Sequence, residues 1–285
     1  FEDVKNGKAD SIFKTPIYGG AILFGATIWT IIHYTTTYKS LLIDNRGIKF
    51  GNIFKTEFVL WSDIEKIDLI GKSQIMMSPA DASKFTLKDG RQIDILSKYY
   101  ANMPAIRTSL AQVFDCIKAQ RPIEINLKTN VQVKDNLDFV HTNRMTKYSG
   151  NHFLSFNGIL IYGWIAVSIY MVSIWSDSGV ILIVLAFMLG VIYGSLGLQL
   201  YYFYIGEKYL EVKNHVWPWI NDKYRIDDIK QIIFEIPYKR STSLRIITKD
   251  YKSKLYSAGS LRDNTWKTLL HDIKKLNIDA KNEAF

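Results

Sequence analysis

Five histidines are the first candidates for chemistry in this sequence, because an imidazole can bind a metal or transfer a proton near neutral pH. They are scattered without the spacing of a metal site: His33, His141, His152, His215 and His271. The sequence has no His-Glu-x-x-His motif, no cysteine pair, no nucleophile elbow and no phosphate-binding glycine loop. We therefore expect a protein that is not an enzyme and that has no cofactor and no metal site.

The sequence contains more residues suited to contact with lipid or a partner protein than residues suited to catalysis. Trp217-Pro218-Trp219 is the most distinctive aromatic segment. It is interpreted either as a loop that enters lipid headgroups or grips a partner, or as a strand end packed inside a domain.

Basic residues gather in the C-terminal part of the chain. They are Lys239, Arg240, Arg245, Lys249, Lys252 and Lys254. On adjacent strands they could meet anionic lipid headgroups, each contributing about 1 kcal/mol near the surface. The alternative is an ordinary solvated strand face. Nucleic-acid binding is not expected, because no aromatic stacking platform interleaves these charges.

Charge and cysteine content limit the class of protein. The chain has 285 residues, 36 Lys and Arg, 27 Asp and Glu, and a formal net charge of +9. A basic excess fits nucleic acid, an anionic membrane surface, or the positive-inside bias of a membrane protein. Cys116 is the single cysteine, so no intrachain disulfide can form and nothing indicates an oxidising compartment.

The apolar segment 154–205 is the element around which the other parts are arranged. Asp177 is its only charged residue. A membrane span needs about 20 apolar residues, which predicts a transmembrane hairpin with helices at 156–175 and 179–204. Aromatic residues at the helix ends suit the headgroup level: Trp175, Tyr201, Tyr202 and Tyr204. A pair of buried helices in a large soluble protein is the alternative.

A second apolar segment predicts a further transmembrane helix at 16–37, after a polar N-terminal tail at 1–15. From Ile17 to Tyr38 it contains no Asp, Glu, Lys or Arg. The expected fold class is thus a multi-pass α-helical membrane protein with about three transmembrane helices and two α+β domains.

The two expected domains, 38–120 and 206–278, show short apolar-polar alternations that indicate strands, followed by one amphipathic helix. The helical positions in the first are Met103, Ile106, Leu110, Val113, Phe114 and Ile117; those in the second are Trp266, Leu269, Leu270, Ile273 and Leu276. Ser260 is the expected N-cap of the second helix. A connector at 121–153 could contain one further strand, and 279–285 is a tail.

The two domains read as one unit repeated. Both have Asp-Ile-x-x-Ile after a strand, at Asp63 and at Asp228, and both have Lys-Asp between strands, at Lys88 and at Lys249. The aspartate is expected to cap a turn while the two isoleucines enter the core. That role is structural.

These motifs resemble the bacterial pleckstrin-homology (PH) domain of small bacterial membrane proteins. The shared features are Gly-Ile-Lys-Phe, Trp-Ser-Asp-Ile-x-x-Ile, Lys-Asp-Gly and a C-terminal helix that begins near an Asn. The resemblance implies two tandem, partly open antiparallel barrels, each closed by a helix, used for association and scaffolding. The second unit departs from the pattern: Tyr251 replaces the glycine after Asp250, and Val216–Trp219 replaces Ile53-Phe54-Lys55.

The distribution of basic residues predicts the orientation. The turn at 176–179 has no Lys or Arg, whereas Arg144, Lys147, Lys208 and Lys213 flank the hairpin. The positive-inside rule then places both domains in the cytoplasm and leaves Phe1 outside, unless a further helix precedes Phe1.

The predicted function is association or scaffolding by a cytoplasmic (inner) membrane protein, within a larger complex. The expected partners are membrane lipids and other membrane-protein subunits or further copies of this chain, with no nucleic acid. Two alternatives stay open: an anionic-lipid-sensing module, and a subunit of a transporter or channel.

Overall fold

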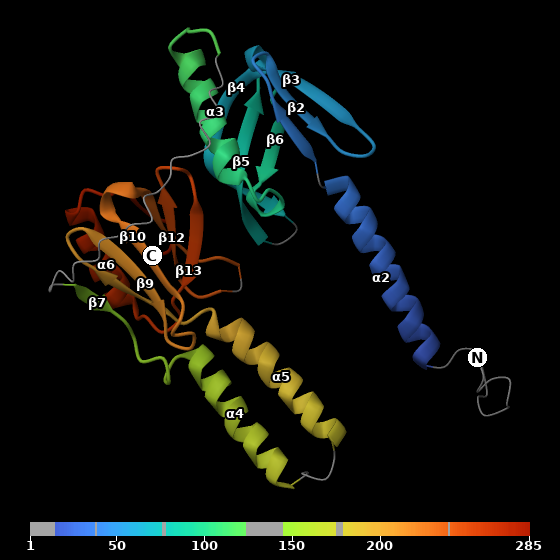
Figure 1. Ribbon diagram of the computed structural model, residues 1–285, viewed down its shortest axis with the longest axis vertical. Helices are drawn as coiled ribbons and strands as arrows, with labels where there is room; N and C mark the ends of the chain where they lie inside the picture. The colour runs from blue at the N-terminus through green and yellow to red at the C-terminus, as the bar shows by residue number, and fades with distance from the viewer. Residues whose placement is uncertain (1–14, 38, 76–77, 124–144, 175–178, 239) are drawn as a thin grey trace. The chain divides into compact units, whose positions relative to one another are not determined.

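The computed structural model describes residues 15–37, 39–75, 78–123, 145–174, 179–238 and 240–285 (Figure 1). The chain forms two compact units. One comprises Phe1–Gly71, Ala82–Tyr99 and Ser109–Asn126; the other comprises Lys72–Asp81, Tyr100–Thr108 and Leu127–Phe285. Residues 124–144 of the connector in which a further strand could lie, and residues 176–178 of the expected turn at 176–179, lie outside the described residues.

The predicted fold class, a multi-pass helical membrane protein, is wrong. The described part of the chain is a mixed fold of five α-helices and fourteen β-strands in four sheets. Within it, one helix, Phe156–Ile174, is long and apolar enough to cross a membrane. A second apolar helical stretch, Leu182–Gly197, is shorter. The helix at Thr15–Thr37, which contains no charged residue, is not among the candidate spans found in the described residues.

The first series of elements begins after helix α2 (Thr15–Thr37). Two antiparallel three-stranded sheets follow, in the orders β1-β2-β3 and β4-β5-β6, and then one helix. The strands and the helix are β1 (Ser40–Ile43), β2 (Gly47–Gly51), β3 (Thr56–Leu60), β4 (Ile64–Ile75), β5 (Ser78–Leu87), β6 (Gln92–Leu96) and α3 (Met103–Lys118). Leu110 and Val113 of α3 are buried, whereas Phe114 and Ile117 are each 39% exposed, so the buried face is narrower than expected.

The second series begins with strand β7 (Thr146–Tyr148) and the helix pair α4 (Phe156–Ile174) and α5 (Gly179–Gly197). Two four-stranded sheets follow, in the orders β10-β9-β8-β7 and β13-β12-β11-β14. Their other elements are β8 (Tyr201–Ile205), β9 (Tyr209–Asn214), β10 (Asn221–Arg225), β11 (Ile229–Glu235), β12 (Ser243–Thr248), β13 (Ser253–Ser257), α6 (Asp263–Lys275) and β14 (Ala280–Asn282). Trp266, fully buried on α6, packs edge-on against Phe234.

The second predicted transmembrane helix, 179–204, extends too far. Helix α5 ends at Gly197, and Tyr201–Ile205 is a strand whose residues alternate between buried and half-buried. Tyr201 is buried in the sheet core rather than placed at a headgroup level. The run of apolar residues continues unbroken from helix to strand, so hydropathy alone hides the boundary.

Equivalent backbone hydrogen bonds support the same architecture in both series. The N–H of Lys88 donates to the carbonyl of Asp63 at 2.9 Å, and that of Lys249 donates to the carbonyl of Asp228 at 2.8 Å. Both bonds use the aspartate carbonyl and come from a distant strand, and neither 3-10 turn has a side-chain capping bond at its N-terminus. Of the isoleucines, Ile229 and Ile232 are buried, whereas Ile64 and Ile67 are half-buried.

The turn between β5 and β6 in the first series has the same conformation as the turn between β12 and β13 in the second series. Gly90 has a φ of +83°, and Tyr251 has a φ of +62° at the equivalent position. Each N–H donates back across the turn, from Gly90 to Leu87 and from Tyr251 to Thr248. The left-handed region favours glycine, so the missing glycine of the second copy does not change the turn but does strain it.

Helix α6 begins later than predicted. Its N-cap is Arg262, which makes no side-chain capping bond, and Ser260 lies two residues upstream. Asp263 in the first turn suits the positive end of the helix dipole.

Candidate association and membrane surfaces

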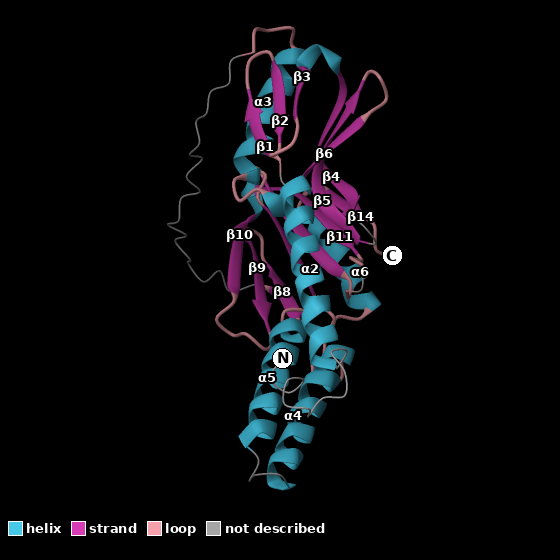
Figure 2. Ribbon diagram, turned by 90° about the vertical axis from the view of Figure 1, so that its right-hand side faces the viewer, coloured by secondary structure: helices cyan, strands magenta, loops and turns pink. Residues whose placement is uncertain are grey.

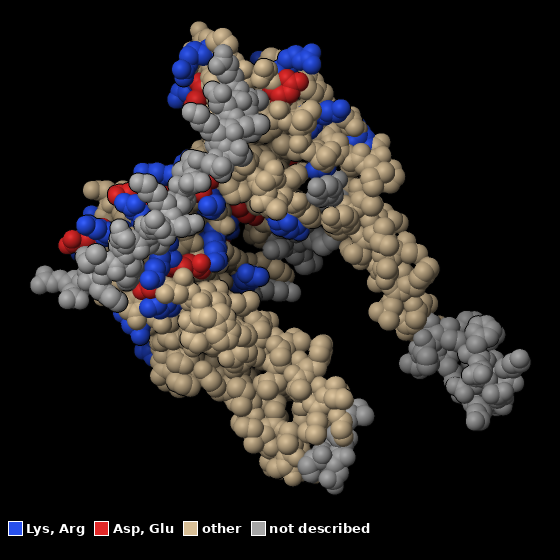
Figure 3. Space-filling model, in the orientation of Figure 1, with Lys and Arg blue, Asp and Glu red and all other residues tan. Residues whose placement is uncertain are grey.

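The helix pair α4 and α5 presents an uncovered apolar surface. The two helices lie side by side and extend from the sheets (Figure 1, Figure 2). In Figure 3 the visible face of both helices shows no charged side chain. Phe156, Ile169 and Phe187 are 75%, 67% and 69% exposed. Only 22% of the apolar window of α4 is buried, so most of its apolar area has no cover within the described structure.

The base of this helix pair, the end nearest the strands, packs against the sheet β10-β9-β8-β7. Ile161 of α4, Leu200 and Val216 form a small buried cluster, with Tyr193 and Trp217 packed against it. The hydroxyl of Tyr193 donates to the carbonyl of Val216 at 3.2 Å. The helix pair and the sheet are therefore joined by packing as well as by the chain.

Trp217 belongs to this junction. Its ring meets Tyr193 edge-on, with centroids 4.7 Å apart. A Cβ on Gly197 would lie 2.8 Å from the Trp217 Nε1 atom, so a glycine is needed for this close approach. Asn214 holds the loop: its Oδ1 accepts from the N–H groups of Val216 and Trp217, at 2.8 and 2.9 Å.

Trp219 lies in the same loop but faces outward. It is 72% exposed, and its ring stands 5.0 Å from that of Trp217. The two interpretations of the Trp-Pro-Trp segment thus apply to different residues. Trp217 is packed in the domain, and Trp219 is available for contact beside the apolar helices.

Two histidines that are far apart in the sequence meet at this base. The rings of His152 and His215 are stacked with centroids 4.4 Å apart, and Tyr202 stacks on His215 at 4.3 Å. Burial, followed by the neighbouring His152 and Lys147, lowers the pKa of His215 to about 4. A neutral imidazole is thus favoured. The sequence shows five scattered histidines and gives no signal for this pair, because their contact is set by β8, β9 and the segment before α4.

Most of the described basic residues on β12, β13 and their turn are engaged by acids of the same unit. Lys252 lies 3.0 Å from Asp250, and Lys254 lies 2.6 Å from Asp222. Arg240 and Lys249 are exposed. Lys239 lies outside the described residues. The cationic surface is therefore weaker than the number of basic residues indicates, because neighbouring carboxylates neutralise part of it.

Arg245 belongs to a buried ion network. Its guanidinium donates to Oε1 of Glu235 at 2.6 Å, and Glu235 is 3% exposed. Lys72 lies 2.6 Å from the other carboxylate oxygen of Glu235. Asp81 extends the network, 3.6 Å from Arg245 and 3.0 Å from the buried Arg107. With a side chain only 12% exposed, Arg245 is a structural cation and does not present its charge to a membrane surface.

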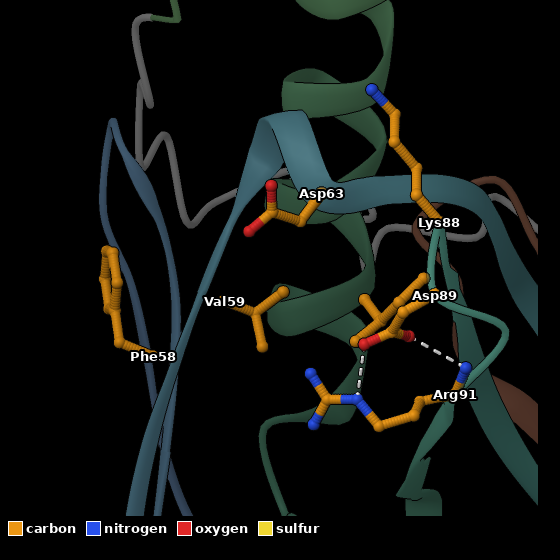
Figure 4. Close-up of a pocket in the computed structure, with 7 residues that line it drawn as sticks. Phe58, Val59, Asp63, Lys88, Asp89 and Arg91 are labelled. Atoms are coloured by element: carbon orange, nitrogen blue, oxygen red, sulfur yellow. Dashed lines mark hydrogen bonds and ion pairs between the residues drawn. The ribbon is translucent and has the colours of Figure 1, made fainter.

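A small hollow of about 210 Å³ lies beside the Lys88–Arg91 turn of the first unit (Figure 4). Its lining combines apolar and charged side chains: Phe58, Val59, Asp63, Leu87, Lys88, Asp89 and Arg91. Arg91 donates to Asp89 at 2.6 Å and to Glu57 at 2.7 Å. These two carboxylates raise the pKa of Arg91 and neutralise its charge, so this guanidinium is poorly suited to a phosphate ligand.

No group of three or more His, Cys, Asp or Glu side chains suited to a metal occurs among the residues described. The candidate association surface is the apolar helix pair together with the exposed Trp219. No protein-family model matches this chain, and no curated protein matches it significantly.

Proposed function

We propose that this chain is a non-enzymatic, membrane-anchored association protein. In this proposal, two PH-like units lie on the cytoplasmic side of a bacterial inner membrane, which the helix pair α4 and α5 enters from that side. The units hold other subunits of a membrane complex, or further copies of the chain. The repeated order of two sheets and a closing helix supports the PH-like assignment.

The observation that carries the proposal is the uncovered surface of α4. This helix has no charged residue between Phe156 and Ile174, and its large side chains are exposed. Leaving such a surface in water is unfavourable by about 25 cal/mol for each Å² of apolar area. A bilayer removes that penalty, and α4 has the length of a span.

Scaffolding is favoured over anionic-lipid sensing by the ion pairs of the second unit. Lys252 and Lys254 are paired with carboxylates, and Arg245 is buried. Exposed ion pairs leave little net charge to attract an anionic surface. The apolar helix and Trp219 supply attachment to any bilayer, whatever its charge.

A charged substitution on α4 tests the anchor. Ile169 is 67% exposed, so Ile169→Asp leaves the packed base intact while it opposes insertion by about 3 kcal/mol. Membranes carrying the wild type and Ile169→Asp would be washed with alkaline carbonate. We expect the wild type and the matched control Ile169→Leu to stay in the pellet, and Ile169→Asp to be partly extracted. Full extraction of the wild type would refute the anchor.

A further inference from the structure

An unbroken series of ring contacts connects the outer face of the sheet β10-β9-β8-β7 to the start of helix α4. Neighbouring ring centroids in this aromatic ladder lie between 4.1 and 5.7 Å apart. The rings of the ladder, in order, are those of Tyr204, Tyr202, His215, His152, Phe153 and Tyr162. The first two belong to β8 and the last belongs to α4, so the ladder ends where the uncovered apolar surface begins.

The α4 end of the ladder is apolar and exposed. Phe153 and Leu154, just before the helix, are 56% and 69% exposed, and Phe156 in its first turn is more exposed still. These side chains continue the apolar surface of α4 as far as the ladder. If α4 is inserted in a bilayer, they meet the acyl chains and the ladder lies among the headgroups, which is where tyrosine rings are enriched in membrane proteins.

The sheet end of the ladder is flanked by two lysines. The Lys147 ammonium lies 5.1 Å from the ring centroid of Tyr202 and 5.9 Å from that of Tyr204. The Lys213 ammonium lies 5.1 Å from the centroid of Tyr204. The ring of Tyr204 therefore has one cation beside it from β7 and another from β9.

The outward face of this sheet has more bases than acids. The strand register places four basic residues on it: Lys147, Lys213, Lys223 and Arg225. Glu211 is the only acid at its described outward positions, and its Oε1 lies 3.3 Å from Lys213 and 3.8 Å from Lys223. One carboxylate cannot neutralise this face, and basic side chains are visible next to the base of the uncharged helix pair in Figure 3.

We propose that Lys147 and Lys213 bind the phosphate of a membrane phospholipid whose acyl chains lie along the exposed start of α4. An ammonium group and a phosphate oxygen form a charge-assisted hydrogen bond, which is stronger than one between neutral groups. The site has cations at one end and apolar side chains at the other, so it is complementary to an amphipathic lipid. A soluble anion would leave Phe153 and Leu154 without a partner.

This site differs from the basic residues of β12, β13 and their turn. Those residues belong to the other sheet of the second series, and Lys252 and Lys254 are engaged by carboxylates there. The ladder lies instead on the sheet against which the helix pair packs. The inference rests on the proposed membrane anchor and names the lipid group that the anchor meets at the membrane surface.

Native mass spectrometry of the full-length chain in mild, phosphate-free detergent tests the site, because it counts the lipids bound during a titration. The two ligands are phosphatidylglycerol and a diacylglycerol that has the same acyl chains but no phosphate. We expect phosphatidylglycerol to bind about fivefold more tightly than diacylglycerol or better. Lys147→Gln should weaken phosphatidylglycerol binding about fivefold and leave diacylglycerol binding unchanged.

Three further variants define the role of charge. Lys147→Arg keeps the cation and should keep the binding. Lys213→Gln should weaken phosphatidylglycerol binding about twofold to threefold, because Glu211 already shares the charge of Lys213. The matched control Lys230→Gln removes a β11 lysine that also lies over a tyrosine ring, and it should change neither affinity. Melting temperatures show that each variant is folded, and the substitutions at positions 147 and 213 test the site independently.

Equal binding of the two lipids, or phosphatidylglycerol binding that neither Lys147→Gln nor Lys213→Gln weakens, would overturn the site. Displacement of the lipid by millimolar inorganic phosphate would reveal a site for a free anion and overturn the lipid assignment. The anchor has a separate readout, which is the carbonate wash. If the wild type stays in the pellet while the two lipids bind alike, the anchor stands and only the headgroup site is excluded.

Discussion

The hydroxyl of Tyr148, on the short strand β7, donates a hydrogen bond to the carboxylate of Asp272 on α6. This single bond ties the edge of a sheet to the helix that closes the core. The hydrogen bond lowers the pKa of Asp272, whereas burial, followed by this hydrogen bond, raises the pKa of Tyr148. Strand β7 precedes the apolar helix pair, so the bond helps to fix the anchor to the domain.

Removing this hydroxyl should destabilise the second unit. For Tyr148→Phe we expect a loss of about 1 kcal/mol in the free energy of unfolding, because one charge-assisted bond to a partly solvated carboxylate disappears. Asp272→Asn should cost less, since an acceptor remains. Urea unfolding of the full chain in detergent, followed by tryptophan fluorescence, measures both. Equal stability of Tyr148→Phe and wild type would contradict the assignment.

The two turn residues with positive φ predict opposite effects of glycine. Gly90→Ala places a Cβ in the left-handed region and should cost about 1 kcal/mol, although the space around it is empty. Tyr251→Gly relieves the same strain but loses the contact of Lys230 with the ring, 3.7 Å from its centroid. We expect that variant to be near neutral. The melting temperatures of the two variants measure these effects. A Gly90→Ala variant that is more stable than the wild type would contradict the positive φ assigned to this turn.

The His215 environment predicts a pH-dependent stability. The folded state holds the imidazole neutral down to about pH 4, whereas the unfolded chain binds a proton near pH 6.5. The unfolded state therefore binds more protons between these values, and stability must fall as the pH drops from 6.5 towards 4. Lys147, His152 and Tyr202 lie around this ring, and burial with the first two sets the shift.

A thermal-shift series from about pH 7 to about pH 4 measures this effect. His215→Gln should reduce the slope, whereas His271→Gln, at an exposed position, should leave it unchanged. A slope that is identical in wild type and His215→Gln would show that another group causes it.

The ion network around Glu235 predicts a large loss of stability when this carboxylate is neutralised. Glu235→Gln leaves Arg245 and Lys72 without their shared counter-charge in a buried site, and should cost about 3 kcal/mol. The matched control is Glu65→Gln, at an exposed carboxylate, which should change stability by less than about 0.5 kcal/mol. Chemical unfolding of both variants tests the difference, and equal effects would argue against a structural role for Glu235.

Substitutions of Trp217 and Trp219 should distinguish a role in folding from a role in membrane contact. Trp217→Ala removes packing against Tyr193 and should destabilise the unit by about 2 kcal/mol. Trp219→Ala should leave stability within about 0.5 kcal/mol and weaken retention on neutral liposomes. If Trp219→Ala unfolds the protein, its side chain is not the free contact described above.

Local patterns in the sequence predict much of the sheet architecture and little of the membrane segment. Strand alternation and the Asp-Ile-x-x-Ile repeat locate the turns after Leu60 and Arg225, where both copies form a short 3-10 turn. The boundary of α5 could not be found in this way. Its apolar residues pass directly into the buried strand Tyr201–Ile205, and both environments select the same side chains.

Side-chain contacts between segments that are distant in the sequence leave no pattern in the sequence itself. The Arg245 side chain follows the same alternation as a solvated strand residue. Only the register of the neighbouring strand shows that Arg245 lies opposite Ile233, so that Glu235, two residues along, is within reach of its guanidinium. The stack of His152 on His215 likewise depends on how the chain before α4 meets the end of β9. Side-chain pairing across strands carries no periodic signal, so such sites appear only once the fold is known.

The central claim, membrane-anchored association, is tested most directly by native purification. The full-length chain would be extracted from its own membranes in mild detergent and analysed by size-exclusion chromatography with mass spectrometry. We expect an assembly larger than the 32.9 kDa monomer, with stoichiometric partner subunits or further copies of the chain. A monomer that carries no partner, or a chain that leaves the membrane without detergent, would contradict it.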